Sequence, residues 1–201
     1  MTPRESTIEG EVYTHRYLWA SLKRVRDVAA EKDEDAPFFW LSAMLLAYLT
    51  YEAYLNYVGD RVAPEVWSGE KEVFSKGKYR GEEAKLRKIE EVTGIRVDKA
   101  KRPYQTVKKL KKVRDMLVHG KVEKFRFDTV VEEDTVPKMF QITLEEYVSK
   151  SQFDRALHDT EQLIEHIQQE LGSKWEYDHL FPGKALVGSL ASSTGNPKKK
   201  I

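Results

Sequence analysis

The sequence contains no cysteine among its 201 residues. Disulfide bonds, thiolate metal sites and a cysteine nucleophile are therefore all excluded. An excess of one charge is also missing, because 34 lysines and arginines face 33 aspartates and glutamates. Over the whole chain this balance gives no indication of a nucleic-acid partner. Hydrophobic residues make up 40% of the sequence, which is enough for the core of one domain of ordinary size.

Long hydrophobic runs are also scarce. The most apolar stretch is residues 38–49, and a helix of that length extends about 18 Å, short of the ~30 Å hydrocarbon core of a membrane. Beyond this stretch the chain meets Glu52 and Asp60. The first ten residues lack the apolar segment of a secretory signal. We therefore expect a buried core helix, no membrane contact and a cytoplasmic protein.

Helix start and stop signals divide the chain into segments. A capping-box pattern at Ser6–Glu9, followed by apolar residues at helical spacing, predicts a first helix that runs to about Lys32. Gly59 is placed to end the second helix, and residues 60–80 are expected to form a connector. The pattern predicts further helices over residues 36–58, 81–93, 103–118 and 143–171.

The hydrophobic period changes ahead of the last predicted helix. Residues 125–127 and 140–142 alternate apolar and polar side chains, which predicts a small β-hairpin. A second capping box at Thr143–Glu146 then opens the last helix. The expected fold is all-α, an antiparallel bundle of four to five helices with this hairpin inserted before the last long helix. Residues 1–182 are expected to form one domain and residues 183–201 a flexible tail.

Residues 114–120 read RDMLVHG and stand at the end of a predicted helix. Arg114 offers a guanidinium that can hold a phosphate, and His119 offers an imidazole that can move protons near neutral pH. Asp115 can orient either group by accepting hydrogen bonds. This pair suits the cleavage of a phosphodiester. The alternative is structural: Arg114 pairs with a carboxylate, and His119 caps the helix.

The RDMLVHG segment resembles the R-[N/D/H]-x3-H signature of the HEPN superfamily of helical nucleotide-binding domains. The aromatic, Glu-containing segment 51–56 (YEAYLN) is similar to a helix common in its bacterial members. The order of the predicted helices also fits over about residues 8–171. Asp115 occupies a position where asparagine is commoner in the family.

The resemblance implies a function. Catalytic members are metal-independent endoribonucleases of toxin–antitoxin and other defence systems, and they need no cofactor. They dimerise so that two motifs line one cleft. Arg114 and His119 would then be catalytic, with Asp115 assisting, and the RNA 2′-hydroxyl would attack the adjacent phosphorus to leave a 2′,3′-cyclic phosphate. Other members only bind nucleotides or protein partners, so a non-catalytic binding module is the alternative.

The near-zero net charge hides a strong segregation of charge. Residues 99–124 hold ten lysines and arginines against two acidic residues, whereas residues 143–171 hold seven acidic residues against two basic ones. A basic segment around the motif would attract an RNA backbone. The alternatives are a solvated helix face or a docking surface for an acidic partner. The lysines expected to bind RNA are Lys108, Lys111, Lys112 and Lys121.

Three further groups of residues complete the expectations. Glu52 is expected to support the site as a buried partner of Arg114, the alternative being a surface acid. His158, Glu161 and Glu165 lie near one face of the last helix, but they lack the paired Glu-x-x-His pattern of a dimetal site, so no metal is expected. Tyrosines repeat every three residues in the second helix and predict core or dimer packing rather than base stacking: Tyr48, Tyr51, Tyr54 and Tyr57. The expected partners are a second copy of the chain, RNA, and an antitoxin or other protein.

Overall fold

The computed structural model describes residues 7–32, 36–76, 80–120 and 147–196. Within these ranges the chain forms seven helices and two strands. In chain order the elements are β1 (Thr7–Val12), α1 (Thr14–Glu31), α2 (Ala36–Val62), α3 (Pro64–Trp67), α4 (Glu70–Val73), α5 (Glu82–Thr93), α6 (Tyr104–Val118), α7 (Lys150–Gly172) and β2 (Ala191–Asn196). The predicted all-α fold is confirmed.

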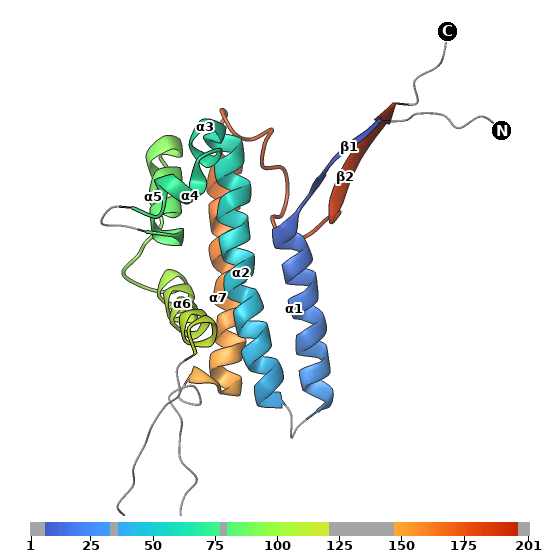
Figure 1. Ribbon diagram of the computed structural model, residues 1–201, viewed down its shortest axis with the longest axis vertical. Coiled ribbons are helices and arrows are strands. Elements are labelled where there is room, and N and C mark those ends of the chain that lie inside the picture. Colours follow the sequence, from blue (N-terminus) through green and yellow to red (C-terminus); the bar gives the residue numbers. More distant parts are fainter. Residues whose placement is uncertain (1–6, 33–35, 77–79, 121–146, 197–201) are drawn as a thin grey trace, which may run out of the picture.

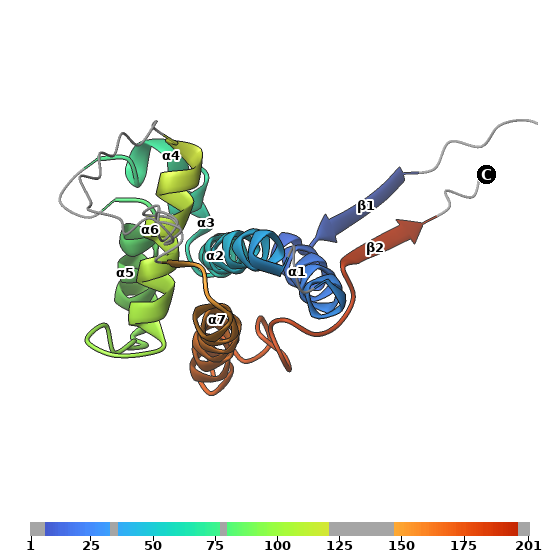
Figure 2. The ribbon, with the colours of Figure 1, turned by 90° about the horizontal axis from the view of Figure 1, so that it is seen from below.

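Helix α2 is the centre of the bundle. It contacts α1, α3, α5, α6 and α7 (Figure 1). The first two helices are antiparallel, whereas α7 runs parallel to α2: Trp40 stacks on Phe153 near the start of both helices, with 6.2 Å between ring centroids. Further along, the Tyr54 hydroxyl donates a 3.0 Å hydrogen bond to Oε1 of Gln168. Helix α6 lies crosswise to these two helices (Figure 2).

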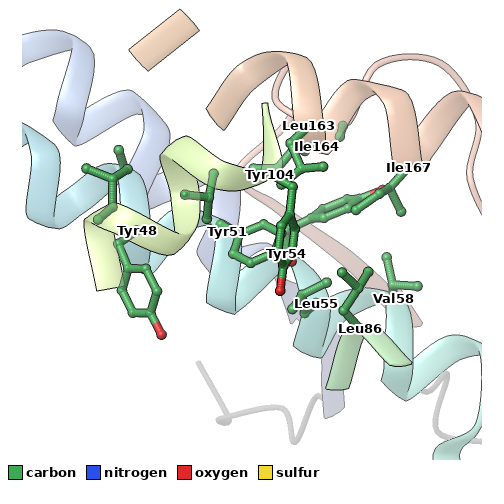
Figure 3. Close-up of a cluster of buried hydrophobic side chains, with 14 of the residues drawn as sticks. Tyr48, Tyr51, Tyr54, Leu55, Val58, Leu86, Tyr104, Leu163, Ile164 and Ile167 are labelled. Carbon is green, nitrogen blue, oxygen red and sulfur yellow. The ribbon is translucent and has the colours of Figure 1, made fainter. Parts of the chain in front are cut away.

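The tyrosines of α2 form the middle of the core, as the sequence predicts. Tyr48, Tyr51 and Tyr54 are each at most 1% exposed. Figure 3 shows them among aliphatic side chains from neighbouring helices, including Leu86 of α5 and Leu163 of α7. Each buried aromatic ring removes a large apolar area from water. This packing fixes the position of α6 and α7 relative to α2.

The start of the chain differs from the prediction. Residues Thr7–Val12 form strand β1, and α1 begins only at Thr14. Strand β1 pairs antiparallel with β2, from Thr7 opposite Asn196 to Val12 opposite Ala191. The capping-box prediction at Ser6–Glu9 is therefore wrong, because the backbone groups of this segment bond to a strand from the other end of the sequence. The hairpin predicted within residues 125–142 lies outside the described residues.

The predicted flexible tail is also corrected for residues 183–196. Arg16 of α1 holds this segment against the bundle: its Nε donates to the carbonyl of Ala185 at 3.0 Å, and its Nη1 to that of Ser189 at 3.1 Å. The preceding Phe181 is buried. The C-terminal segment thus belongs to the domain, and β2 continues from it.

The end of α2 differs in one respect. The helix continues through Gly59 to Val62, so Gly59 does not end it. A Cβ at this position would lie 1.9 Å from the ring of Trp67 on α3. Glycine is therefore required by the close approach of an indole. The predicted end of α5 is confirmed, because Gly94 follows it in the left-handed conformation with a φ of 70°.

Helices α6 and α7 carry the candidate site. The predicted span of α6 is confirmed to within one residue. Helix α7 begins at Lys150, about seven residues later than predicted, with Ser149 as its N-cap accepting a 3.3 Å hydrogen bond from the amide of Gln152. The capping box predicted at Thr143–Glu146 lies outside the described residues.

Among the described helices, α2 alone is long and apolar enough to span a membrane by length and composition. A helix at the centre of a soluble bundle meets the same criterion. In this fold the other helices cover much of α2, whose buried positions include Ala43, Ala47 and Leu55.

Candidate nucleic-acid interface and active site

The predicted catalytic pair lies at the C-terminal end of α6. Arg114 lies four residues before Val118, the last residue of the helix, and its side chain is 30% exposed. His119 is the C-cap residue, its amide donates a 3.0 Å hydrogen bond to the carbonyl of Asp115, and its side chain is exposed. The sequence therefore placed both residues correctly relative to the helix end. The imidazole is open to a ligand.

Asp115 bridges two cations. Its Oδ2 accepts a 2.6 Å hydrogen bond from Nζ of Lys111, and its Oδ1 accepts one of 2.8 Å from Nη1 of Arg114. Partial burial raises the pKa of Asp115, but these two hydrogen bonds outweigh it and hold the pKa below its ordinary value. Asp115 is thus an ionised acceptor near neutral pH. It positions the two cations and is unsuited to act as a proton donor.

Arg114 also faces α2. Its guanidinium carbon lies 5.9 Å from the ring centroid of Tyr48, whose hydroxyl lies near Glu82 at the start of α5. Burial raises the pKa of Tyr48 well above its ordinary value and also raises that of Glu82. The hydrogen bond to Asp115 raises the pKa of Arg114, and the charge of Glu52 adds to this effect. We call these residues the motif cluster: Tyr48, Glu52, Glu82, Lys111, Arg114, Asp115 and His119.

Glu52 was predicted as a buried partner of Arg114, but no ion pair or hydrogen bond joins the two side chains within the described residues. The side chain is half-buried on α2 and close enough to Arg114 to act on its charge. The direct ion pair of Arg114 within the described residues, however, is with Asp115. Sequence reasoning missed Tyr48 and Glu82, which come to the motif through the packing of α2 and α5.

The four lysines expected to bind RNA have different surroundings. Lys108 is exposed, Lys111 is bound to Asp115, and Lys121 lies outside the described residues. Lys112 lies on another face of α6, away from Arg114, because positions i and i+2 of an α-helix are about 200° apart around its axis. It lines a pocket between α6 and α7.

This α6–α7 pocket has a volume of about 430 Å³. Its polar lining includes Arg102, Lys109, Lys112 and Arg155. Its apolar lining consists of Met44, Leu110, Val113, Tyr147 and Ala156. The described lining contains no acidic residue. The sequence did not predict Arg102 or Arg155 as site residues. Arg102 belongs to the basic segment 99–124, whereas Arg155 reaches the pocket only because α7 packs on α6.

No group of three or more histidine, aspartate and glutamate side chains that could hold a metal ion occurs in the described ranges. His158 instead lies next to Asp159, with 3.3 Å between its Nδ1 and Oδ1 of the carboxylate. Comparison of the chain with models of known protein families, with curated proteins and with solved structures found no match.

Proposed function

We propose that this protein is a metal-independent endoribonuclease that acts as a homodimer. The observation that carries the proposal is the RDMLVHG segment at the end of α6, where an exposed His119 follows a partly exposed Arg114 by five residues. The resemblance of this segment to the HEPN signature supplies the reaction type. Because one chain offers a single copy of the motif, the second imidazole of the proposed cleft comes from a second copy.

The proposed reaction uses the groups of the motif cluster in separate roles. One His119 takes the proton of the RNA 2′-hydroxyl, whose oxygen attacks the adjacent phosphorus. The 5′-oxygen leaves and receives a proton from the His119 of the other copy. Arg114 stabilises the extra negative charge on the phosphoryl oxygens, and Asp115 holds Arg114 and Lys111 in place. The products are a 2′,3′-cyclic phosphate and a 5′-hydroxyl.

Location and partners belong to the same proposal. We propose a cytoplasmic enzyme of a toxin or defence system, held in check by an antitoxin or another protein. Expression of the wild-type chain in bacteria should then slow growth, and expression of His119→Ala should not. Equal growth with both proteins, at matched and verified expression levels, contradicts the toxin role.

The nuclease activity itself is tested with purified protein in the presence of EDTA. We expect cleavage of a single-stranded RNA by the wild type and at least a hundredfold slower cleavage by His119→Ala. Arg114→Lys keeps the charge but removes the planar guanidinium, and we expect it to slow cleavage as well. The matched control is His166→Ala, which removes an exposed histidine of α7.

Product analysis tests the type of reaction. The fragments should carry 2′,3′-cyclic phosphate and 5′-hydroxyl ends, and RNA with a 2′-O-methyl group at the cleaved position should resist. Wild-type cleavage rates in His119→Ala, or 5′-phosphate products, would remove the proposed mechanism. Sedimentation of the wild type as a monomer at the concentration of the assay contradicts the composite cleft.

A second candidate function is a binding module without catalysis. The contacts of Arg114 favour it, because Asp115 already holds the guanidinium against the ring of Tyr48. This candidate predicts saturable binding of RNA or of a nucleotide without any cleavage. It also predicts equal binding by the wild type and His119→Ala.

A further inference from the structure

The α6–α7 pocket carries three cations without a described partner. Lys109, Lys112 and Arg155 make no ion pair or hydrogen bond with any residue in the described ranges. Two of them lie three residues apart on α6, and the third faces them from α7. Like charges gathered around one hollow repel each other, so an anion bound among them would be stabilised.

The fourth cation of the pocket is held in position. Arg102 uses Nε and Nη2 to bind the two carboxylate oxygens of Asp159, both at 2.6 Å. Asp159 also accepts a hydrogen bond from the hydroxyl of Thr106, and its side chain is 1% exposed. A guanidinium has five N–H donors, so Arg102 retains donors at Nη1 for a ligand. A buried carboxylate thus fixes an arginine at the edge of the pocket.

Size and lining restrict the ligand further. The volume of about 430 Å³ falls within the range of about 300–1,000 Å³ of small-molecule sites. Met44, Leu110 and Val113 offer an apolar surface, and the ring of Tyr147 adds an aromatic face. A bare inorganic anion would leave this surface in water. A ligand with an apolar or aromatic part covers it.

We propose that the α6–α7 pocket binds a phosphate monoester carried on an apolar or aromatic group. A monoester has a charge of about −1.5 to −2 near neutral pH, which matches the three cations better than the single charge of a phosphodiester. The guanidinium of Arg102 and the side chains of Lys109, Lys112 and Arg155 bind the phosphate, and the apolar lining binds the remainder. This site is separate from the motif cluster, so it stands whether or not the protein cleaves RNA.

Calorimetric titration of the purified protein tests the proposal with small probes. We expect 1-naphthyl phosphate to bind saturably, and 1-naphthol and inorganic phosphate each to bind at least tenfold more weakly. The affinity should fall as salt is raised. A 2′-O-methyl trinucleotide, with and without a 5′-phosphate, tests whether the natural ligand is the phosphorylated end of an RNA. Tighter binding of its phosphorylated form than of naphthyl phosphate assigns the pocket to an RNA end, and weaker binding assigns it to a free small ester.

Charge-neutral variants locate the binding. Lys109→Gln, Lys112→Gln and Arg155→Gln should each weaken the binding of naphthyl phosphate by about tenfold, the usual effect of losing one charge-assisted hydrogen bond. The matched control is Lys108→Gln, which removes an exposed charge from α6 outside the pocket. Thermal unfolding of every variant should match that of the wild type.

Three outcomes overturn the proposal. The first is an absence of saturable binding of any phosphate probe, and the second is equal binding of naphthol and its phosphate. The third is an equal loss of affinity in Lys108→Gln and in the three pocket variants, which would mean general surface attraction. Binding retained by His119→Ala separates the pocket from the motif cluster, and a failure of the nuclease assay leaves this test unaffected.

Discussion

Asp159 accepts hydrogen bonds from two nitrogens of Arg102 while its own side chain is 1% exposed. The arginine is the exposed partner, so the cost of losing it is borne by the buried carboxylate. We expect Arg102→Gln to lower the free energy of unfolding by about 2 kcal/mol, because the buried carboxylate then keeps only its contacts with Thr106 and His158. Urea denaturation at neutral pH measures this loss.

The pH dependence of the free energy of unfolding tests the role of the same ion pair, Arg102 and Asp159. Burial raises the pKa of Asp159, but the hydrogen bonds from Arg102, Thr106 and His158 outweigh it and leave the pKa below its ordinary value. The ionised carboxylate therefore stabilises the fold above the unfolded-state pKa, and this contribution is lost as pH falls through the folded-state pKa. Arg102→Gln should lose less stability on acidification than the wild type. An unchanged pH profile would contradict the role of the ion pair.

The second prediction concerns His15, which is 1% exposed among the rings of Tyr54 and Tyr57. Burial lowers its pKa to about 4, and the neighbouring Arg16 adds to this. The pKa of His15 in the unfolded chain is near 6.5. The stability contributed by the neutral imidazole is therefore present above pH 6.5 and is lost as pH falls towards 4. Between pH 7 and pH 5 we expect this group to remove about 2 kcal/mol of stability.

His15→Phe isolates this contribution because phenylalanine keeps a ring in the cluster and does not titrate. Its stability should fall less between pH 7 and pH 5 than that of the wild type. His166→Phe, an exposed position on α7, should retain the wild-type slope. The idea fails if the two variants lose stability in parallel.

The third prediction concerns the contact of α2 with α3. Gly59→Ala would place a Cβ 1.9 Å from the Trp67 ring, so the indole or the helix must move. Overpacking of this kind costs about 1–3 kcal/mol, which we expect as a lower midpoint of urea denaturation. Gly69→Ala is the control, because the nearest atom to its new Cβ is a Val73 methyl carbon at 3.7 Å. In a Trp67→Leu background, Gly59→Ala should cost less stability than it does in the wild type; strictly additive effects would contradict the clash.

The fourth prediction concerns the carboxylate between Lys111 and Arg114. Asp115→Asn removes one negative charge from the motif cluster but keeps a carbonyl oxygen that accepts a hydrogen bond from Arg114. We expect tighter RNA binding and a steeper dependence of log affinity on log salt, by about one ion. Fluorescence polarisation in a His119→Ala background measures binding without cleavage. The charge reversal Lys111→Glu in the same cluster should act in the opposite direction, and unchanged affinity in both variants would place RNA elsewhere.

Local signals were sufficient for most of α2, for α5 and for α6, whereas a distant contact decided the structure of the segment before α1. The end of α5 was predictable because Gly94 adopts a backbone conformation that other residues avoid. The strand at Thr7–Val12 was not, because its hydrogen-bond partners begin at Ala191. A capping-box pattern of four residues carries no information about a strand that far along the sequence.

The candidate site divides in the same way. The order of Arg114, Asp115 and His119 along α6 follows from their spacing, so their place at the helix end was predictable. The contact with Tyr48 and the charge of Arg155 beside Lys112 depend on how α2 and α7 pack on α6. Helical periodicity alone assigns faces to one helix but does not say which face meets which neighbour.

The pairing of β1 with β2 has a mechanical consequence. Thr7 and Asn196 lie opposite each other at the outer end of this two-stranded ribbon, and the bundle lies at its inner end (Figure 1). A force that pulls these two residues apart therefore acts on one hydrogen-bonded pair of strand residues at a time, beginning with the outermost pair. We therefore expect the strands to separate pair by pair before tension reaches α1, which follows β1 in the chain.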